Sequence, residues 1–455
     1  MNRTPDLTKS QLFLDDLWID EQHKLTRLWH PADIYPDPVL VAEKPWEGTT
    51  IQVSTVMKTG DHWKMYYTAR HAMRGQTVFC IAESEDGMQW KRPALGLVEF
   101  NGSKQNNILP VEYRKGLRPI CHDPDDEQAP FKMIHLAPGG IWGAISKDGY
   151  HWTKLDKPLI PHPPASDVLS IWFNKVDGKY IITHKTIHGR SGRAVCIAES
   201  EDFRTFSDSR LIMKADLIDP PDVEYHGMVG FAYADLHLGL VERWINVPNH
   251  FELMLTWSHD RKTWHRPIAR EAFIGPTYDW NQGWHVGASS APYQVGNQLW
   301  FHFTSGRRSR GGPHFCVKNG PPMREVVGLA TVTVDRFVSI TAGFMEGQLV
   351  TKPMTWPGGD LLLNASTTRH LDGYPLDGGG AMQVEVWDAS GQPIEGFAGE
   401  SAAPFDRNAP TRGTVEPAVV RWPGERSLDE LEGRRIRLNF LMRDAHLYSF
   451  RSSGA

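Results

Sequence analysis

The chain of 455 residues lacks the long apolar segment that a membrane-spanning helix requires. No window approaches about 18 uninterrupted apolar residues, so we expect no helix that crosses a bilayer. The first twenty residues contain Lys9 and Asp15 where a signal peptide would have its apolar core. We therefore expect a cytoplasmic protein without a secretory leader.

Cysteine and basic charge are also scarce. The four cysteines include no Cys-x-x-Cys pair, which excludes a disulfide scaffold and favours a reducing compartment. Lys and Arg number 49 against 54 Asp and Glu, for a formal net charge of −5. Without a basic excess, the chain is not expected to bind nucleic acid.

The motifs of several cofactor and nucleophile sites are missing. No Gly-x-Gly-x-x-Gly segment opens a helix, and neither a phosphate-binding loop nor a Gly-x-Ser-x-Gly elbow occurs. The 20 histidines show no His-Glu-x-x-His spacing. We therefore expect no cofactor and no catalytic metal.

Tryptophan, glycine and proline, in contrast, are abundant. The 17 Trp outnumber the 14 Met and the 12 Tyr, beside 41 Gly and 32 Pro. This composition is typical of many short strands joined by turns. Flat aromatic faces can also stack on sugar rings, although packing between strands explains them equally well.

A Ser-x-Asp signature recurs four times, beginning at Ser84, Ser146, Ser200 and Ser258. Consecutive copies are 62, 54 and 58 residues apart, and each one follows a short apolar run. Because Ser and Asp side chains bond to neighbouring backbone groups, each copy predicts a strand that ends in a tight turn.

Two more apolar runs precede each signature. In the first unit they are Thr50–Met57 and Trp63–Thr68, followed by Val78–Ala82. A fifth unit lacks the signature and ends in Val327–Val334. Units of this length with three or four antiparallel strands are typical of propeller blades, so we predict a five-bladed β-propeller over residues 1–345.

The remaining residues, 346–455, alternate apolar and polar positions between glycine-rich turns. This pattern predicts a C-terminal β-sandwich, with one short helix at Ser427–Leu431 that Ser427 caps. The expected fold class is all-β.

Candidate catalytic residues are polar residues just before the innermost strand of each blade, because these strands would surround one channel. They are Glu47, Asp167, Asp222, Glu224, Asp279 and His285. Glycoside cleavage needs two carboxyl groups beside one bond, and a third acid can separate their pKa values. We predict Glu47, Asp167 and Glu224 as the catalytic carboxylates, whereas Asp123 falls in a turn between strands.

Other residues could bind a sugar. The candidate hydrogen-bonding side chains are Arg27, His30, Arg70, Arg118 and His314, and the candidate stacking rings are Trp46, Trp280 and Trp284. A structural or surface role is also open for each of them.

Three segments resemble a known group of proteins: Trp46-Glu47-Gly48, Asn106-Asn107-Ile108-Leu109 and Leu447-Tyr448-Ser449-Phe450. The chain is similar to uncharacterised bacterial proteins described as resembling the N-terminal domain of glycoside hydrolase family 32. The resemblance implies a five-bladed propeller like those of families 32, 43, 62, 68 and 130, and a β-sandwich that follows it. It also implies carboxylates from three successive blades, although the Asn-Asp-Pro-Asn-Gly and Glu-Cys-Pro motifs are absent.

Together these features predict a glycoside hydrolase that cleaves a furanoside or related small glycan. Two alternatives stay open. One is a non-catalytic propeller that binds carbohydrate or acts as a scaffold. The other is a sialidase-like enzyme, because the Ser-x-Asp turns resemble the Asp-box of sialidases.

Overall fold

The computed structural model shows an all-β protein. It describes residues 5–70, 77–111, 117–163, 166–189, 192–247, 250–307, 325–367, 370–371, 374–375, 380–405 and 417–454. Within these ranges the only helices are short 3-10 turns, and none could cross a membrane. His314 lies outside the described residues.

The chain divides into two compact units. Unit 2 comprises Ala32–Tyr293 and Trp300–Thr331, and unit 1 comprises Met1–Pro31, Gln294–Leu299 and Val332–Ala455. The division differs from the predicted boundary at residue 345, because residues 1–31 and 332–345 belong to unit 1. The reason is strand pairing: the N-terminal strands add to sheets whose other strands come from the C-terminal third of the chain.

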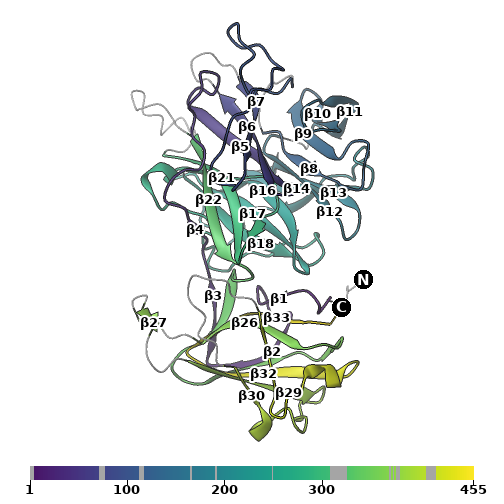
Figure 1. Cartoon of the computed structure of the whole chain (residues 1–455), viewed down its shortest axis with the longest axis vertical. Helices are drawn as coiled ribbons and strands as arrows, with labels where there is room; N and C mark the ends of the chain where they lie inside the picture. The colour runs from purple at the N-terminus through teal and green to yellow at the C-terminus, as the bar shows by residue number, and fades with distance from the viewer. Residues whose placement is uncertain are drawn as a thin grey trace. The chain divides into compact units, whose positions relative to one another are not determined.

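Unit 2 is built from successive groups of antiparallel strands (Figure 1). The first group is β5 (Thr50–Thr59), β6 (His62–Arg70) and β7 (Thr77–Ser84). The second is β8 (Ile120–His122), β9 (Phe131–Ala137), β10 (Gly140–Ser146) and β11 (Thr153–Pro161). The third is β12 (Leu169–Asn174), β13 (Lys179–Ile187), β14 (Arg193–Ser200) and β15 (Arg210–Met213).

The fourth group is β16 (Val223–Tyr233), β17 (Leu236–Ile245) and β18 (His250–Ser258). The last contains β19 (Trp284–Gly287), β20 (Tyr293–Val295), β21 (Gln298–Gly306) and β22 (Glu325–Thr333), after the 3-10 turn η2 (Asp279–Asn281). The short strand β4 (Asp33–Ile34) pairs with β22, and β22 meets β5 at Glu325 and Thr50. The beginning of unit 2 is thus joined directly to its end.

Apolar side chains pack between neighbouring groups. Tyr66 and Phe79 of the first group share a cluster with Met133 of the second. Trp172 of the third group shares another with Met228 of the fourth. Neighbouring groups therefore pack against one another through their apolar side chains.

The first strands of the groups meet through buried serines. The Ser289 N–H donates to the carbonyl of Ser54 on β5 at 2.8 Å. The Ser289 hydroxyl lies 3.0 Å from the hydroxyl of Ser170 on β12 and accepts from the Ile171 N–H at 3.0 Å. The Thr55 hydroxyl accepts from the Ile120 N–H of β8 at 2.9 Å. These contacts join the middle of β5 to β8, to β12 and to the segment after β19, so they hold the first strands of these groups together.

The four Ser-x-Asp segments form the predicted turns. In each, one aspartate oxygen accepts from two backbone N–H groups that follow it, as Asp86 does from Met88 and Gln89 at 2.9 and 2.7 Å. Cys80 and Cys196 are buried on β7 and β14, as expected for core thiols. Asp123 also lies in a turn, where it accepts from the Asp125 N–H at 3.0 Å.

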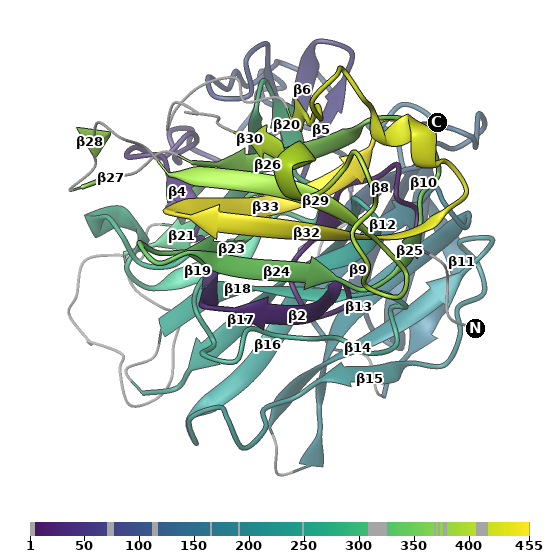
Figure 2. The same cartoon turned by 90° about the horizontal axis from the view of Figure 1, so that it is seen from below.

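Unit 1 contains two larger sheets (Figure 2). One runs β3 (Leu25–Trp29), β23 (Val338–Ala342), β33 (Ala445–Ser452), β26 (Leu361–Ser366) and β31 (Ala418–Val419), with β1 (Gln11–Leu12) beside β33. The other runs β2 (Ile19–His23), β24 (Gly347–Thr351), β32 (Arg435–Arg443), β29 (Ala381–Asp388) and β30 (Ala403–Phe405), with β25 (Met354–Thr355) beside β32.

Three smaller elements complete unit 1: the pair β27 (His370–Leu371) and β28 (Tyr374–Pro375), and the 3-10 turns η3 (Gly399–Ser401) and η4 (Leu428–Leu431). The Ser427 hydroxyl caps η4 by accepting from the Asp429 N–H at 3.1 Å, which confirms the predicted short helix and its cap.

Candidate functional site

Asp167 lies just before β12 and forms an ion pair with Lys185 of β13. Its side chain is 51% exposed, whereas that of Lys185 is 9% exposed. Desolvation of the Asp167 carboxyl group acts to raise its pKa, but Lys185 and, to a smaller extent, His226 lower it more, so the pKa of Asp167 lies below its usual value. Asp167 is therefore an ionised carboxylate that remains accessible.

The residue after Asp167 has an unusual backbone. Val168 has φ of +62°, a left-handed conformation that is rare for a β-branched residue. Its carbonyl accepts from the Lys185 N–H at 3.2 Å. Strained backbone of this kind is concentrated at functional sites, where the surrounding packing maintains it.

A second backbone irregularity, on β16, packs against Val168. The register between β16 and β17 shifts between Tyr225 and Gly227, which makes His226 the extra residue of a β-bulge. A Cβ on Gly227 would lie 2.2 Å from the Val168 Cγ1. Val168 thus occupies the space that the missing side chain leaves, so the residue after Asp167 packs against the residue after His226.

His226 is fixed on several sides. Its Nδ1 lies 2.9 Å from the Glu242 Oε2, and the Glu242 side chain is 1% exposed. The rings of Trp244, Phe251 and Trp284 stand edge-on to the imidazole, with centroids 5.2 to 6.4 Å away. The side chain of His226 nevertheless remains 12% exposed.

Glu224 precedes His226 on β16 and forms an ion pair with Arg193 of β14. The Arg193 guanidinium lies 4.2 Å from the ring centroid of Trp244, a cation–π contact. A Cβ on Gly192 would lie 2.3 Å from the Glu224 Oε1, so glycine leaves room for this carboxylate. Asp167 directly precedes β12, Glu224 and His226 lie at the start of β16, and Glu242 faces His226 from β17; we call these four residues the β12/β16 cluster.

Glu47, the third predicted carboxylate, lies in a different environment. It is fully buried and accepts from the Tyr67 hydroxyl at 2.6 Å, from Arg92 at 2.6 and 3.1 Å, and from the N–H groups of Glu43 and Lys44. Burial alone would raise the pKa of Glu47. These hydrogen-bond donors lower it by more, so the pKa lies below its usual value. This network favours a structural role for Glu47.

Most of the predicted binding residues lie apart from the β12/β16 cluster. The Trp46 indole donates to Asn107 at 2.8 Å, and the Trp280 indole donates to the Pro36 carbonyl at 2.8 Å. Asp279 is 94% exposed and lies 3.4 Å from Arg307. Arg70 ends β6 with its side chain exposed, and the exposed Asp222 accepts through its carbonyl from the Asn246 N–H at 2.9 Å.

Three further candidates are buried. Trp284 packs against His226, as described above, and is the one predicted ring that contacts the cluster. The Nδ1 of His285 lies 2.6 Å from the Phe251 carbonyl, and burial lowers the pKa of His285 to about 4. The Arg118 guanidinium lies 5.9 Å from the Phe79 ring centroid.

Two of the predicted residues belong to unit 1. The Nε2 of His30 lies 2.8 Å from the Ser339 hydroxyl, and Arg27 donates to the Phe13 carbonyl at 2.9 Å. Both therefore contribute to the packing of unit 1 and not to the β12/β16 cluster.

His226 and Glu242 were missed from the sequence. Glu242 is an acidic residue that directly follows the apolar stretch of β17, and such a buried acid in a strand is a signal for a paired charge. His226 occupies the same face of β16 as Glu224 by strand alternation, but the bulge that directs it is not visible in the residue order.

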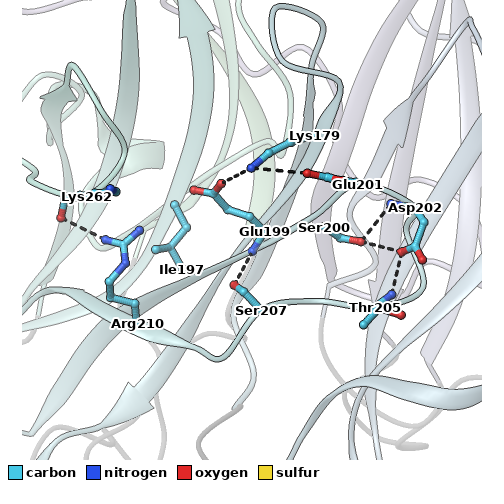
Figure 3. A pocket seen from close by; sticks show the side chains of 10 residues that line it. All are labelled: Lys179, Ile197, Glu199, Ser200, Glu201, Asp202, Thr205, Ser207, Arg210 and Lys262. Atoms are coloured by element: carbon cyan, nitrogen blue, oxygen red, sulfur yellow. Dashed lines mark hydrogen bonds and ion pairs between the residues drawn. The ribbon is translucent and has the colours of Figure 1, made fainter. Parts of the chain in front are cut away.

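A separate groove of about 550 Å³ lies along β13, β14 and β15 (Figure 3). Its charged side chains largely compensate one another: Lys179 lies 3.7 Å from Glu199 and 3.9 Å from Glu201. Lys262 enters it from the turn after β18. None of the predicted site residues lines this groove.

No protein-family model and no curated protein sequence matches the chain. The similar solved structures are mainly glycoside hydrolases and phosphorylases. A glycosyl hydrolase from Bacteroides ovatus is 14% identical with a TM-score of 0.47, over 69% of this chain and 98% of its own. An α-L-arabinofuranosidase from Podospora anserina is 12% identical with a TM-score of 0.47, over 67% of this chain and 97% of its own.

A β-1,2-mannobiose phosphorylase from Listeria innocua is 14% identical with a TM-score of 0.45, over 67% of this chain and 98% of its own. With identities this low and TM-scores below 0.5, these similarities carry no argument about the activity of this chain. The specific resemblance to family 32 has no match among them and stays a prediction.

Proposed function

We propose that unit 2 is a five-bladed β-propeller and that the two large sheets of unit 1 form a β-sandwich. The pairing of β4 with β22 supports a closed ring, because the start of unit 2 supplies an outer strand to its last group. The contacts of Ser289 with both β5 and β12 support an arrangement of the first strands around one axis.

We propose further that the protein is a glycoside hydrolase acting on a furanoside or related small glycan. The observation that carries this proposal is the accessible, ionised Asp167 held beside β16, which bears Glu224 and His226. Cleavage of a glycosidic bond uses two carboxyl groups on either side of that bond. Asp167 suits the ionised role of base or nucleophile, and Glu224 supplies the second carboxyl group. Glu47 is not part of this assignment.

The test is turnover of a panel of nitrophenyl furanosides and pyranosides by the purified protein. Asp167→Asn and Glu224→Gln are each expected to reduce kcat at least about 100-fold, the usual size of an acid or base contribution. Asp279→Asn is the matched control, because Asp279 is an exposed acid outside the cluster. Equal rates in Asp167→Asn, Glu224→Gln and the wild type would refute the assignment.

The panel also separates the alternatives. Binding of a sugar without turnover of any member would favour a carbohydrate-binding propeller. Turnover of an aryl sialoside would favour the sialidase-like alternative.

A further inference from the structure

One end of the groove along β13, β14 and β15 carries two cations that form no ion pair among the described residues. Arg210 begins β15, and Lys262 lies in the turn after β18 (Figure 3). Lys179, the third lining cation, pairs with both Glu199 and Glu201. Because the charges of Arg210 and Lys262 are not used in this way, this end of the groove suits an anion.

The hydrogen bonds of Arg210 leave one edge of its guanidinium group available. Its Nη1 donates to the carbonyls of Arg261 and Lys262 at 3.3 and 3.1 Å, and its Nη2 donates to the Arg261 carbonyl at 3.3 Å. A guanidinium has five N–H donors, so the Nε–H and the second Nη2–H remain, and no described residue accepts from them. These two donors lie on the same edge of the planar group. A pair of parallel N–H groups of this kind binds both oxygens of a carboxylate.

The turn that holds Arg210 is itself fixed in place. Arg261 has φ of +58°, and its side chain donates to both oxygens of Glu199 at 3.1 and 3.2 Å and pairs with Asp177. The carbonyls of Arg261 and Lys262 are therefore held where they orient the Arg210 guanidinium. Because these bonds exist before a ligand arrives, Arg210 loses little conformational freedom on binding it.

The rest of the groove offers hydroxyl groups and hydrogen-bond acceptors. The Glu201 side chain is 83% exposed, and the Thr205 hydroxyl makes no hydrogen bond to a described residue. A ligand with several hydroxyl groups could donate to Glu201 and bond to Thr205. The groove volume of about 550 Å³ lies in the range of small-molecule sites.

We propose that this groove binds a sugar acid, which is a polyhydroxylated ring that carries a carboxylate. The carboxylate accepts from the Nε–H and the Nη2–H of Arg210, and Lys262 supplies a second positive charge. The ring hydroxyls face Glu201 and Thr205. The groove contains no residue of the β12/β16 cluster, so this inference goes beyond the proposed function.

The experiment compares glucuronate, glucose and acetate by calorimetric titration of the full chain at constant ionic strength. Glucuronate differs from glucose in having a carboxylate in place of the exocyclic CH₂OH group, and acetate has a carboxylate without a ring. We expect glucuronate to bind at least about 10-fold more tightly than glucose, the size of one hydrogen bond to a charged group. We also expect it to bind more tightly than acetate. No binding of glucuronate, or an affinity equal to that of either other compound, would overturn the inference.

Two variants locate the binding. Arg210→Lys keeps the positive charge but cannot present two parallel donors, so we expect at least about 10-fold weaker binding of glucuronate. Lys262→Gln changes an exposed side chain that holds no other element, and we expect about 2- to 5-fold weaker binding. Lys147→Gln, in the equivalent turn after β10, is the matched control and should have no effect. Wild-type affinity in both Arg210→Lys and Lys262→Gln would refute the site.

Asp167→Asn separates this groove from the β12/β16 cluster. We expect it to leave the affinity for glucuronate unchanged, and a loss of affinity would overturn the groove site by placing the ligand at the cluster. Binding that depends on Arg210, in a protein that hydrolyses no glycoside, would instead remove the proposed hydrolase function and keep the groove site.

Discussion

Val168 fills the space that a side chain on Gly227 would occupy, with its Cγ1 2.2 Å from the position of the missing Cβ. This contact joins the left-handed residue after Asp167 to the bulge that carries His226. The irregularity before β12 and the bulge on β16 are thus complementary. Each would be unfavourable alone, and together they define the position of Asp167.

Gly227→Ala tests this contact directly. The added methyl group overlaps Val168, so we expect a loss of about 1–3 kcal/mol in the free energy of unfolding, together with a lower kcat/KM on the nitrophenyl glycosides. Gly343→Ala is the control, because a Cβ at Gly343 would meet no atom within 4 Å. Denaturant unfolding and steady-state kinetics measure the two effects. An unchanged Gly227→Ala protein would show that the packing of Val168 does not hold Asp167 in place.

Lys185→Met changes the charge next to Asp167. The desolvation that raises the pKa of Asp167 would remain, while the largest opposing contribution would be removed. An enzyme that needs the ionised Asp167 carboxylate loses activity as the pH falls through the pKa of Asp167. We therefore expect the acidic limb of the kcat/KM profile to move to higher pH in Lys185→Met. A limb at the wild-type position would mean that Asp167 is not the group that titrates.

Arg92→Met tests the structural role of Glu47. The change would leave a buried carboxylate without its cation, which typically costs about 3–5 kcal/mol. Lys91→Met, which removes an exposed ion pair with Glu85, should cost less than about 1 kcal/mol. Unfolding curves compare the two.

Glu47 should also contribute to the pH dependence of stability. Folding lowers the pKa of Glu47, so ionised Glu47 stabilises the folded protein. This stabilisation is fully present above the pKa of Glu47 in the unfolded chain, and it is lost as the pH falls through the pKa in the folded protein. Glu47→Gln should therefore flatten the acidic side of the stability curve. A Glu47→Gln protein with full stability and no turnover would restore Glu47 as a catalytic candidate.

Two buried histidines should make the protein sensitive to acid. Burial lowers the pKa of His285 and of His302 from 6.5 to about 4 each. Unfolded chains bind protons to these groups below pH 6.5, so stability falls between pH 6.5 and 4, by up to about 3 kcal/mol for each histidine. His285→Gln and His302→Gln should each reduce this slope, whereas the exposed His151→Gln should not. Parallel curves for all three variants would contradict the lowered pKa values.

Much of the secondary structure could be predicted because its determinants are local. The Ser-x-Asp turns are held by bonds between residues two or three positions apart, so the residue order suffices to locate them. The cap of η4 is equally local, since Ser427 bonds to Asp429. The division into two units could not be predicted from neighbouring residues, because β3 pairs with β23 more than 300 residues later in the chain.

The candidate site was predicted only in part. The rule that selects polar residues before inner strands found Asp167 and Glu224, but it selected Glu47 equally. Glu47 is distinguished by Tyr67 and Arg92, which are 20 and 45 residues away. His226 acquires its place through a bulge and through Glu242, 16 residues further along the chain.

Strands, turns and the all-β class follow from the order of polar and apolar residues, because hydrogen bonds and side-chain alternation act over a few positions. The accessibility of each acid follows only from the tertiary structure. The Glu47 carboxylate is surrounded by donors from neighbouring strands and is fully buried, whereas Asp167 pairs with Lys185 and leaves half of its side chain accessible. Glu47 and Asp167 differ in these contacts and not in their place in the repeat.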